Sequence, residues 1–349
     1  MLIDALAARF GGTAAATVQL ARHLVLDDRV ADVTVVCRRG SIVERGLAGE
    51  QAVRRIALPV PRGVELLQRV VWEALRLPAL ARREQYEVLI SMSGIVPRAP
   101  ECRLVCLIGN PVMYESDGLA NALRRWAVRR TAAGDAYLAA PSRHMADMVV
   151  ASVGRPCDVL AWGVDHSTFF PAASPGAEIL CVGDFKAYKR HDLVLDAWRR
   201  LPAPRPRLRL VGNPDVEPSA HASLLARIDS APEAESIKLD HRLAHEQMPD
   251  VYRRARVFVI ASEHESFCMP LVESMACGVP AIARDIPSLR ETGGAGALYL
   301  GGDDPGEWAA AIGRLCNDGE EHRRASELAV QSAARFNWER FVAELAEHL

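Results

Sequence analysis

The 349-residue chain contains no apolar run approaching the roughly 18 to 20 residues that a membrane-spanning helix needs. Residues Met1–Leu6 carry no basic leader, so we expect no targeting peptide and a cytoplasmic location. The eight cysteines include no Cys-x-x-Cys pair, and most lie in apolar runs, as Cys181 does. This distribution favours buried, reduced thiols over disulfides or a zinc site.

Excess positive charge is also missing, because the formal net charge is −2. A protein that binds nucleic acid through its phosphates is usually basic, so this class is disfavoured and no nucleic-acid partner is expected. The common nucleotide-binding fingerprints are absent too. The segment Gly294–Tyr299 resembles Gly-x-Gly-x-x-Gly but ends in tyrosine and precedes a strand, and no Gly-x4-Gly-Lys-Ser/Thr loop occurs. These absences disfavour an NAD dehydrogenase and a P-loop NTPase.

Short apolar runs alternate with longer helical patterns, which is typical of parallel α/β layers. The predicted strands are Leu2–Leu6, Val33–Cys37, Val88–Met92, Leu104–Ile108, Ala136–Ala140, Cys157–Ala161, Ile179–Val182, Leu208–Val211, Ile237–Leu239, Val257–Ile260, Ala281–Ala283 and Leu298–Leu300. The predicted helices include Ala14–Leu26, Val64–Arg83, Asp192–Arg200, Ala220–Ile228, Met248–Arg253, Pro270–Cys277 and Gly306–Asn317.

A segment rich in proline and small residues, Phe170–Gly176, separates two series of strands and is expected to be a linker. We therefore predict two Rossmann-like α/β domains that face each other across a cleft. The first comprises residues 1–168 with 335–349 packing back onto it, and the second comprises residues 169–334. Open α/β sheets bind ligands beyond the carboxyl ends of their strands, so the site is expected in that cleft.

Two strand-to-helix junctions are candidates for phosphate binding. At Gly11-Gly12-Thr13, glycine allows close backbone approach to an anion at a helix N-terminus, although a tight turn explains the pair equally well. The second junction follows Val257–Ser262, where a loop carrying Glu265 leads into a helix that begins at Pro270 and ends before Gly278.

We expect Glu273 in the first turn of that helix, where the helix dipole favours a carboxylate. Backbone amides of Phe267, Cys268 and Met269 could hold a diphosphate, with the two carboxylates available to sugar hydroxyls. Two glutamates eight positions apart are a weak pattern alone, and the strand–loop–helix setting makes the pattern more specific.

The segment Ser262–Pro280 closely resembles the signature of glycosyltransferase family 4, whose members are retaining enzymes of the GT-B fold. Other segments resemble this family in the same order along the chain. They are Gly11-Gly12, Pro141-Ser142, Gly163–Pro171, Val182–Lys189, Val211-Gly212 and Phe336–Trp338 with the helix that follows.

The resemblance implies a hexosyltransferase that uses a nucleotide-sugar donor, without a metal or another cofactor. Glu265 would lie near the donor sugar and Glu273 on the ribose, with Lys189 neutralising the leaving diphosphate. The other donor-binding residues that it implies are Gly12, Gly183, Arg190, Leu243, Phe267, Cys268 and Met269. The acceptor would be a carbohydrate, a lipid-linked molecule or a small molecule, and Asn110 would lie on the acceptor side.

Three positions depart from the family pattern. Asp184 replaces an arginine beside Gly183, Cys268 replaces a glycine, and Asn110 follows a strand where the family often has a histidine. Asparagine cannot act as a general base, so a donor phosphate oxygen would have to activate the acceptor. A nucleotide-sugar-binding protein with weakened catalysis is therefore the main alternative. A glycoside hydrolase or phosphorylase is a further one, since paired carboxylates also cleave sugars.

Three other features have simpler interpretations. His241 and His245 have the spacing of helix-borne metal ligands, but a third ligand is not evident and a solvated loop is favoured. The arginine-rich run Arg124–Arg130 surrounds one tryptophan; a solvated helix face is the simpler interpretation, and peripheral contact with an anionic membrane is the alternative. The apolar stripe of Val64–Arg83 is expected to pack against the core. The oligomeric state is not predicted.

Overall fold

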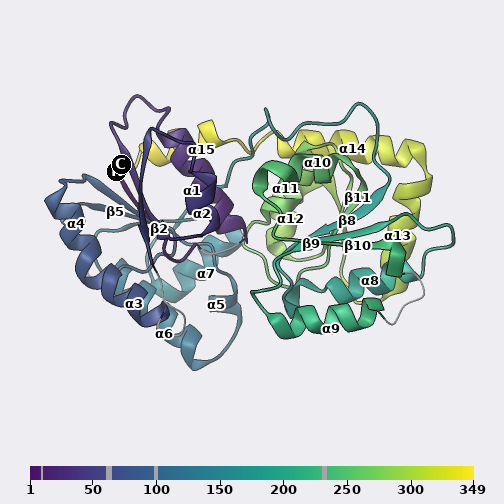
Figure 1. The fold of residues 1–349 in the computed structure, drawn as a ribbon, viewed down its shortest axis with the longest axis horizontal. Helices are drawn as coiled ribbons and strands as arrows, with labels where there is room; N and C mark the ends of the chain where they lie inside the picture. Colours follow the sequence, from purple (N-terminus) through teal and green to yellow (C-terminus); the bar gives the residue numbers. More distant parts are fainter. Residues whose placement is uncertain (9–10, 60–64, 98–100, 230–233) are drawn as a thin grey trace. The chain divides into compact units, whose positions relative to one another are not determined.

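The computed structural model describes residues 1–8, 11–59, 65–97, 101–229 and 234–349 (Figure 1). The chain forms two compact units. Unit 1 comprises Met1–Gly163 together with Trp338–Leu349, and unit 2 comprises Val164–Asn337. Each unit has its own parallel sheet with helices packed against it, which is the doubly wound arrangement that the alternating pattern predicts.

The sheet of unit 1 has seven strands in the order β3-β2-β1-β4-β5-β6-β7. The strands are β1 (Leu2–Asp4), β2 (Val33–Arg38), β3 (Val53–Leu58), β4 (Val88–Ser91), β5 (Arg103–Leu107), β6 (Tyr137–Ala140) and β7 (Asp158–Val159). Every observed pairing is parallel, so all the strands end at the same edge. Burial of β1 and β4 on both faces explains why their sequences are apolar except for the last residue of each.

Strand β3 is not among the strands predicted from the sequence. This strand lies at the edge of the sheet, and Arg54 and Arg55 on it are both exposed. An edge strand has only one neighbour and is covered less than a central strand, so it lacks the apolar run by which the other strands are recognised. All the predicted strands of both units coincide with observed strands, with end points shifted by at most two residues.

Helices of unit 1 follow most of its strands. They are α1 (Gly11–Leu24), α2 (Ile42–Gly46), α3 (Glu65–Val71), α4 (Leu77–Arg83), α5 (Val112–Glu115), α6 (Leu119–Ala132), α7 (Arg143–Val153) and α15 (Trp338–Ala346). The single helix expected over Val64–Arg83 is interrupted, because a π-helical turn at Trp72–Arg76 joins α3 to α4. Such turns widen a helix locally and often occur near functional sites.

The C-terminal helix α15 packs on unit 1, as the sequence predicts. Trp338 at its start is almost fully buried, with its ring 5.9 Å from that of His23 in α1 and 6.1 Å from that of Trp162. Phe341, one turn later, stacks on Trp162 at 5.2 Å. These aromatic contacts fix the end of the chain to the unit that contains its beginning.

The sheet of unit 2 has six parallel strands in the order β10-β9-β8-β11-β12-β13. The strands are β8 (Glu178–Val182), β9 (Leu208–Gly212), β10 (Ile237–His241), β11 (Ala255–Ile260), β12 (Ala281–Arg284) and β13 (Ala297–Leu300). The helices are α8 (His191–Arg199), α9 (Pro218–Asp229), α10 (Met248–Arg253), α11 (Met269–Ala276), α12 (Pro287–Gly293), α13 (Pro305–Asn317) and α14 (Gly319–Ala333). Trp198 of α8 and Trp308 of α13 are fully buried in the core of this unit.

All eight cysteines are free thiols, and six of them are buried, as the sequence predicts. Burial raises the pKa of Cys181 to about 12, so this thiol stays protonated and acts as a small apolar side chain. Among the described residues, no helix is both long enough and apolar enough to cross a membrane.

Candidate functional site

The candidate site of unit 2 lies where its two central strands end. Strands β8 and β11 are neighbours in the sheet, so the loops that follow them leave the same edge side by side. Lys189 in the first loop donates a hydrogen bond from Nζ to Oε1 of Glu265 in the second, at 2.6 Å. Both side chains are largely buried. The fold therefore joins two predicted site residues that are 76 positions apart in the sequence.

The charge of Lys189 is stabilised by this contact. Burial alone would lower the pKa of Lys189, but attraction to Glu265, with smaller contributions from Tyr188 and Cys268, raises the pKa above its ordinary value. The ring of Tyr188 also lies 5.4 Å from the Lys189 ammonium and equally far from that of Lys186. Lys189 is therefore a permanent cation at this edge of the sheet.

Asp184, at the position where the family has an arginine, lies in the same loop as Lys189. Burial raises the pKa of its carboxyl, and the charge of Glu265 adds to this effect, whereas Lys186 and Lys189 lower it. The carboxyl is thus close enough to both lysines to be influenced by them. The charge reversal seen in the sequence is consequently a feature of the candidate site and not of a distant surface.

The loop after β11 enters α11 through a strained residue. Cys268 adopts φ +70°, in the left-handed region that glycine tolerates best, and it precedes the first residue of the helix. The glycine of the family pattern therefore has a physical reason at this position. Phe267 is buried beside it, with its ring perpendicular to that of Phe336 at 5.1 Å. This packing fixes the backbone of the loop.

Helix α11 begins at Met269, one residue before the predicted start, with Pro270 in its first turn and Gly278 at φ +72° after its end. The prediction that Glu273 lies in the first turn is wrong. Glu273 is the fifth helical residue and lies in the second turn, because the helix starts earlier than Pro270. Its carboxylate is therefore held by side-chain contacts and not by the backbone amides of the helix end.

Glu273 is 4% exposed and is held by two side chains that the sequence analysis did not assign. The hydroxyl of Tyr252, in α10, donates to Oε2 of Glu273 at 2.7 Å. Nδ1 of His245 lies 3.9 Å from Oε1. The predicted helix Met248–Arg253 placed Tyr252 on α10, but no local pattern indicated which carboxylate the tyrosine would meet.

Arg190, predicted to contact the donor, forms an ion network within unit 2. Its Nη1 donates to Glu263 at 2.8 Å and to Asp303 at 2.7 Å. Asp303 also accepts from Nη2 of Arg284 at 2.6 Å. The network ties together the loops that follow β8, β11 and β13. Arg190 itself has φ +53° at the start of α8, which directs the chain from the Lys189 turn into the helix.

Two further predicted donor residues lie at the same edge of unit 2. Gly183 directly follows β8, and a β-carbon added there would lie 3.6 Å from the Lys189 side chain. Leu243 follows β10 and is half-buried, two strands away from β8 in the sheet. Its neighbour His241 ends β10, whereas His245 begins a short 3-10 turn, so the two histidines do not share a helix.

In unit 1, Gly12 and Asn110 follow strands that end at one edge. Gly12 is exposed in the first turn of α1, after Gly11 at φ +63°. Asn110 is exposed between β5 and α5, and β4 lies between β1 and β5 in the sheet. Within unit 1 these two residues are thus two strands apart, at the carboxyl ends where such sheets bind ligands.

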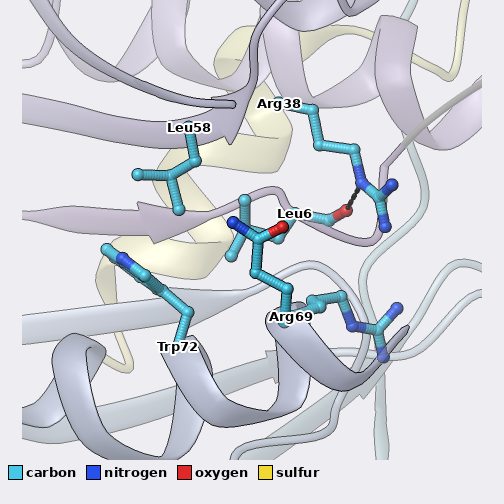
Figure 2. A pocket seen from close by; sticks show the side chains of 6 residues that line it. Leu6, Arg38, Leu58, Arg69 and Trp72 are labelled. Carbon is cyan, nitrogen blue, oxygen red and sulfur yellow. Dashed lines mark hydrogen bonds between the residues drawn. The ribbon is translucent and has the colours of Figure 1, made fainter. Parts of the chain in front are cut away.

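A small pocket of unit 1 lies at this edge too, lined by Leu6, Arg38, Leu58, Gln68, Arg69 and Trp72 (Figure 2). Close to it are two buried carboxyls, Asp4 at the end of β1 and Glu73 in the π-helical turn. Burial raises the pKa of both groups, and repulsion from Asp4 raises that of Glu73 further. Arg69 Nε lies 3.1 Å from Oε1 of Glu73. None of these groups is among the site residues predicted from the sequence.

Two family models match consecutive parts of the chain. The model described as Glycosyltransferase Family 4 matches residues 10–168, and the model described as Glycosyl transferases group 1 matches residues 169–331. Within the described ranges, no group of three or more histidine, cysteine or acidic side chains is arranged to hold a metal ion.

The chain is also similar to curated proteins named D-inositol 3-phosphate glycosyltransferase. The protein from Thermobispora bispora is 34% identical over 207 residues, which are 53% of this chain and 48% of the relative. The protein from Acidothermus cellulolyticus is 27% identical and the match covers 95% of this chain and 84% of the relative. The first three relatives are matched over only about half of their own length.

Solved structures resemble the whole chain. HepE (Alr3699) of Anabaena, solved in complex with UDP-glucose, has a TM-score of 0.83 and 17% identity, with 100% of this chain and 99% of HepE covered. Sucrose-phosphate synthase of Thermosynechococcus elongatus has a TM-score of 0.78 and 18% identity, with 99% and 97% covered. These similarities confirm the predicted fold, two Rossmann-like α/β units of the GT-B type.

Proposed function

Because the chain belongs to the group 1 and family 4 glycosyltransferases, we propose that it transfers a hexose from a nucleoside diphosphate donor to a hydroxyl group of an acceptor, with retention of anomeric configuration. The observation that carries this proposal is the 2.6 Å contact between Lys189 and Glu265, beside the loop that enters α11. It brings a cation for phosphate and a carboxylate for sugar hydroxyls to one edge of unit 2.

Lys189 and the loop before α11 stabilise the leaving group in this proposal. Departure of the nucleoside diphosphate concentrates negative charge on its phosphate oxygens, and a cation already in place lowers the barrier without reorganisation. Amides of Phe267, Cys268 and Met269 are fixed by the packing of Phe267 and by the helix that follows. This assignment needs no metal ion, so a chelator is expected to leave the activity unchanged.

The two carboxylates have separate roles in the proposal. Glu265 accepts hydrogen bonds from hydroxyls of the donor sugar and stabilises positive charge that develops at the reacting carbon. Glu273 accepts hydrogen bonds from the ribose, with Tyr252 holding one of its oxygens at 2.7 Å. Gly183, Arg190 and Leu243 complete the donor side, and Gly12 contributes amides at the start of α1.

Unit 1 carries the acceptor side in this proposal, with Asn110 as a polar contact. Since the relatives are named for D-inositol 3-phosphate, a phosphorylated cyclitol is the first acceptor to test. Since HepE was solved with UDP-glucose, UDP-glucose is the first donor. Asn110 has no basic group, so a phosphate oxygen of the donor takes up the acceptor proton.

The test begins with thermal shift in a panel of UDP- and GDP-sugars and the free diphosphates, because a bound ligand raises the melting temperature by mass action. The selected donor is then incubated with D-inositol 3-phosphate and simple sugars, and the anomeric configuration of the product is read by NMR. Glu265→Gln is expected to lower turnover at least about a hundredfold. Glu320→Gln, an exposed glutamate on α14, is the charge-matched control and is expected to leave turnover unchanged.

A binding protein with weakened catalysis is the second candidate, favoured by Asp184 among the lysines of the phosphate loop. It would show the thermal shift without transfer to any acceptor and without slow hydrolysis of the donor. A glycoside hydrolase would cleave simple glycosides without any nucleotide. Absence of a shift with every nucleotide would contradict both the transferase and the binding protein.

A further inference from the structure

Helix α6 (Leu119–Ala132) presents an apolar row on the face opposite its buried side. Leu119, Leu123 and Trp126 are 78%, 57% and 58% exposed, respectively, and are spaced by four and three residues, so they lie along one face of the helix. Val128 and Ala132, on the other side, are fully buried in the core of unit 1. A helix at a protein surface ordinarily places charged and polar residues where α6 places these three.

This row is not explained by the scattered apolar residues that every protein surface carries. Three large side chains more than half exposed on consecutive turns make a continuous apolar surface, and such surfaces mark interaction sites. The helix is about 21 Å long, so its outer face is a ridge long enough for several contacts. We define the α6 face as Leu119, Leu123, Trp126 and Arg130, the last being one turn beyond Trp126.

Positive charge borders the apolar row. Arg124, Arg129 and Arg130 are all exposed. In the part of the chain that the structure describes, no carboxylate forms an ion pair with any of the three. The Arg130 guanidinium lies 6.0 Å from the Trp126 ring, so a cation and an amphipathic ring share one end of the face. The helix itself contains no carboxylate, although Glu115 and Asp117 are exposed just before it and Asp135 is exposed just after it.

We propose that the α6 face docks on an anionic lipid bilayer. Leucine and tryptophan side chains at this spacing enter the boundary between headgroups and acyl chains, while arginines beside them contact lipid phosphates. A second copy of the chain fits the face less well. Helix α6 contains arginines and no carboxylate, so a two-fold interface between two copies would concentrate positive charge on both sides of the contact.

The experiment is co-sedimentation of the full chain with phosphatidylcholine vesicles, with and without phosphatidylglycerol. Binding is expected only when the anionic lipid is present, and it is expected to weaken as salt is raised. Leu123→Ser and Trp126→Ser are expected to weaken binding about tenfold or more, because each removes a large apolar group that the bilayer would bury. Arg130→Ser is expected to weaken it about fivefold.

Two controls match these changes elsewhere on the surface. Leu26→Ser removes a leucine that follows α1 and is 77% exposed, and Arg324→Ser removes an exposed arginine of α14. Both are expected to bind vesicles as the wild type does. Since all substituted side chains are exposed, circular dichroism and melting temperature are expected to be unchanged in every variant.

Quenching by brominated lipids locates the contact directly. The tryptophan fluorescence of the wild type is expected to be quenched, and most of this quenching is expected to be lost in Trp126→Phe. The same variant is expected to sediment with vesicles largely as the wild type does. Binding that is absent, that is equal with uncharged lipid, or that is insensitive to Leu123→Ser would overturn the proposal. Concentration-dependent self-association without vesicles, lost in Leu123→Ser, would also overturn it and assign the face to a second copy.

Discussion

His191, the first residue of α8, provides a quantitative test of the electrostatics beside the candidate phosphate loop. It is buried, two positions after Lys189, and its Nε2 is buried without a hydrogen-bond partner in the described structure. Burial and, to a smaller extent, the Lys189 charge lower the pKa of His191 from 6.5 to about 4, although Asp192 and a hydrogen bond with Gly183 oppose the shift. The folded protein therefore keeps this imidazole neutral at pH values where the unfolded chain protonates it.

The sign of the pH dependence follows from this depressed pKa. The contribution of neutral His191 to the free energy of unfolding is fully present above pH 6.5, the pKa in the unfolded chain. It is lost as the pH falls toward about 4, the pKa in the folded protein. From these two values, the loss is about 2 kcal/mol at pH 5 and about 3 kcal/mol at pH 4.

The assay compares His191→Asn with the wild type. Asparagine keeps a donor where Nδ1 of the imidazole lies, so it can still bond the backbone of Gly183 while removing the titrating group. In urea unfolding, the stability of the variant relative to the wild type is expected to rise by about 2 kcal/mol between pH 7.5 and pH 5. Other titrating groups cancel in this difference.

Replacing a second histidine of the chain controls for unspecific effects. His348→Asn changes an imidazole whose side chain is 35% exposed in unit 1, and it is expected to give a much smaller difference. The pKa of His191 is also measurable from its ring proton shift in NMR, assigned by its absence from the variant. Equal pH dependence of His191→Asn and the wild type, or titration of His191 near its ordinary pKa, would refute the reasoning.

Three further outcomes are expected from buried polar groups. Burial raises the pKa values of Asp4 and Glu73, and repulsion from Asp4 raises that of Glu73 further, so their contribution to stability is fully present below the ordinary carboxyl pKa of about 4 and is lost as pH rises. Glu73→Gln is expected to flatten the resulting fall in melting temperature above about pH 5. Tyr252→Phe removes the hydrogen bond to Glu273 and is expected to cost about 1 to 2 kcal/mol in urea unfolding and to raise the donor KM while kcat changes little. Asp184→Asn removes a carboxyl beside two lysines, and calorimetry is expected to show several-fold tighter binding of UDP or GDP; unchanged affinity would separate Asp184 from the phosphate site.

The fold was predictable because most buried parallel strands are mainly apolar runs bounded by turns. The same rule explains the failures. Strand β3 carries exposed Arg54 and Arg55 at a sheet edge, and the π-helical turn at Trp72–Arg76 leaves the apolar spacing of a helix almost unchanged. Neither feature can be recognised from its own residues, because each depends on which other parts of unit 1 pack against the segment.

The chemistry of the candidate site was less predictable than its location. Glu265 and Glu273 could be placed from the strand–loop–helix pattern, but their partners are distant in the sequence. Lys189 and Tyr252 meet these carboxylates only because β8 lies beside β11 and α10 lies beside α11. A left-handed backbone at Cys268 could be expected, because this residue replaces a glycine of the family pattern. The structure shows this conformation.

The contact between Lys189 and Glu265 connects the two halves of the proposed reaction. In the structure, Glu265 lies 2.6 Å from the cation and neutralises it, and Asp184 adds a second acidic group nearby. A diphosphate brings negative charge to the same cation and so competes with Glu265 for it. On the proposed function, arrival of the phosphates releases an oxygen of Glu265, and that oxygen becomes an acceptor for a sugar hydroxyl. One ion pair then holds both side chains in position before binding and couples occupation of the phosphate site to recognition of the sugar.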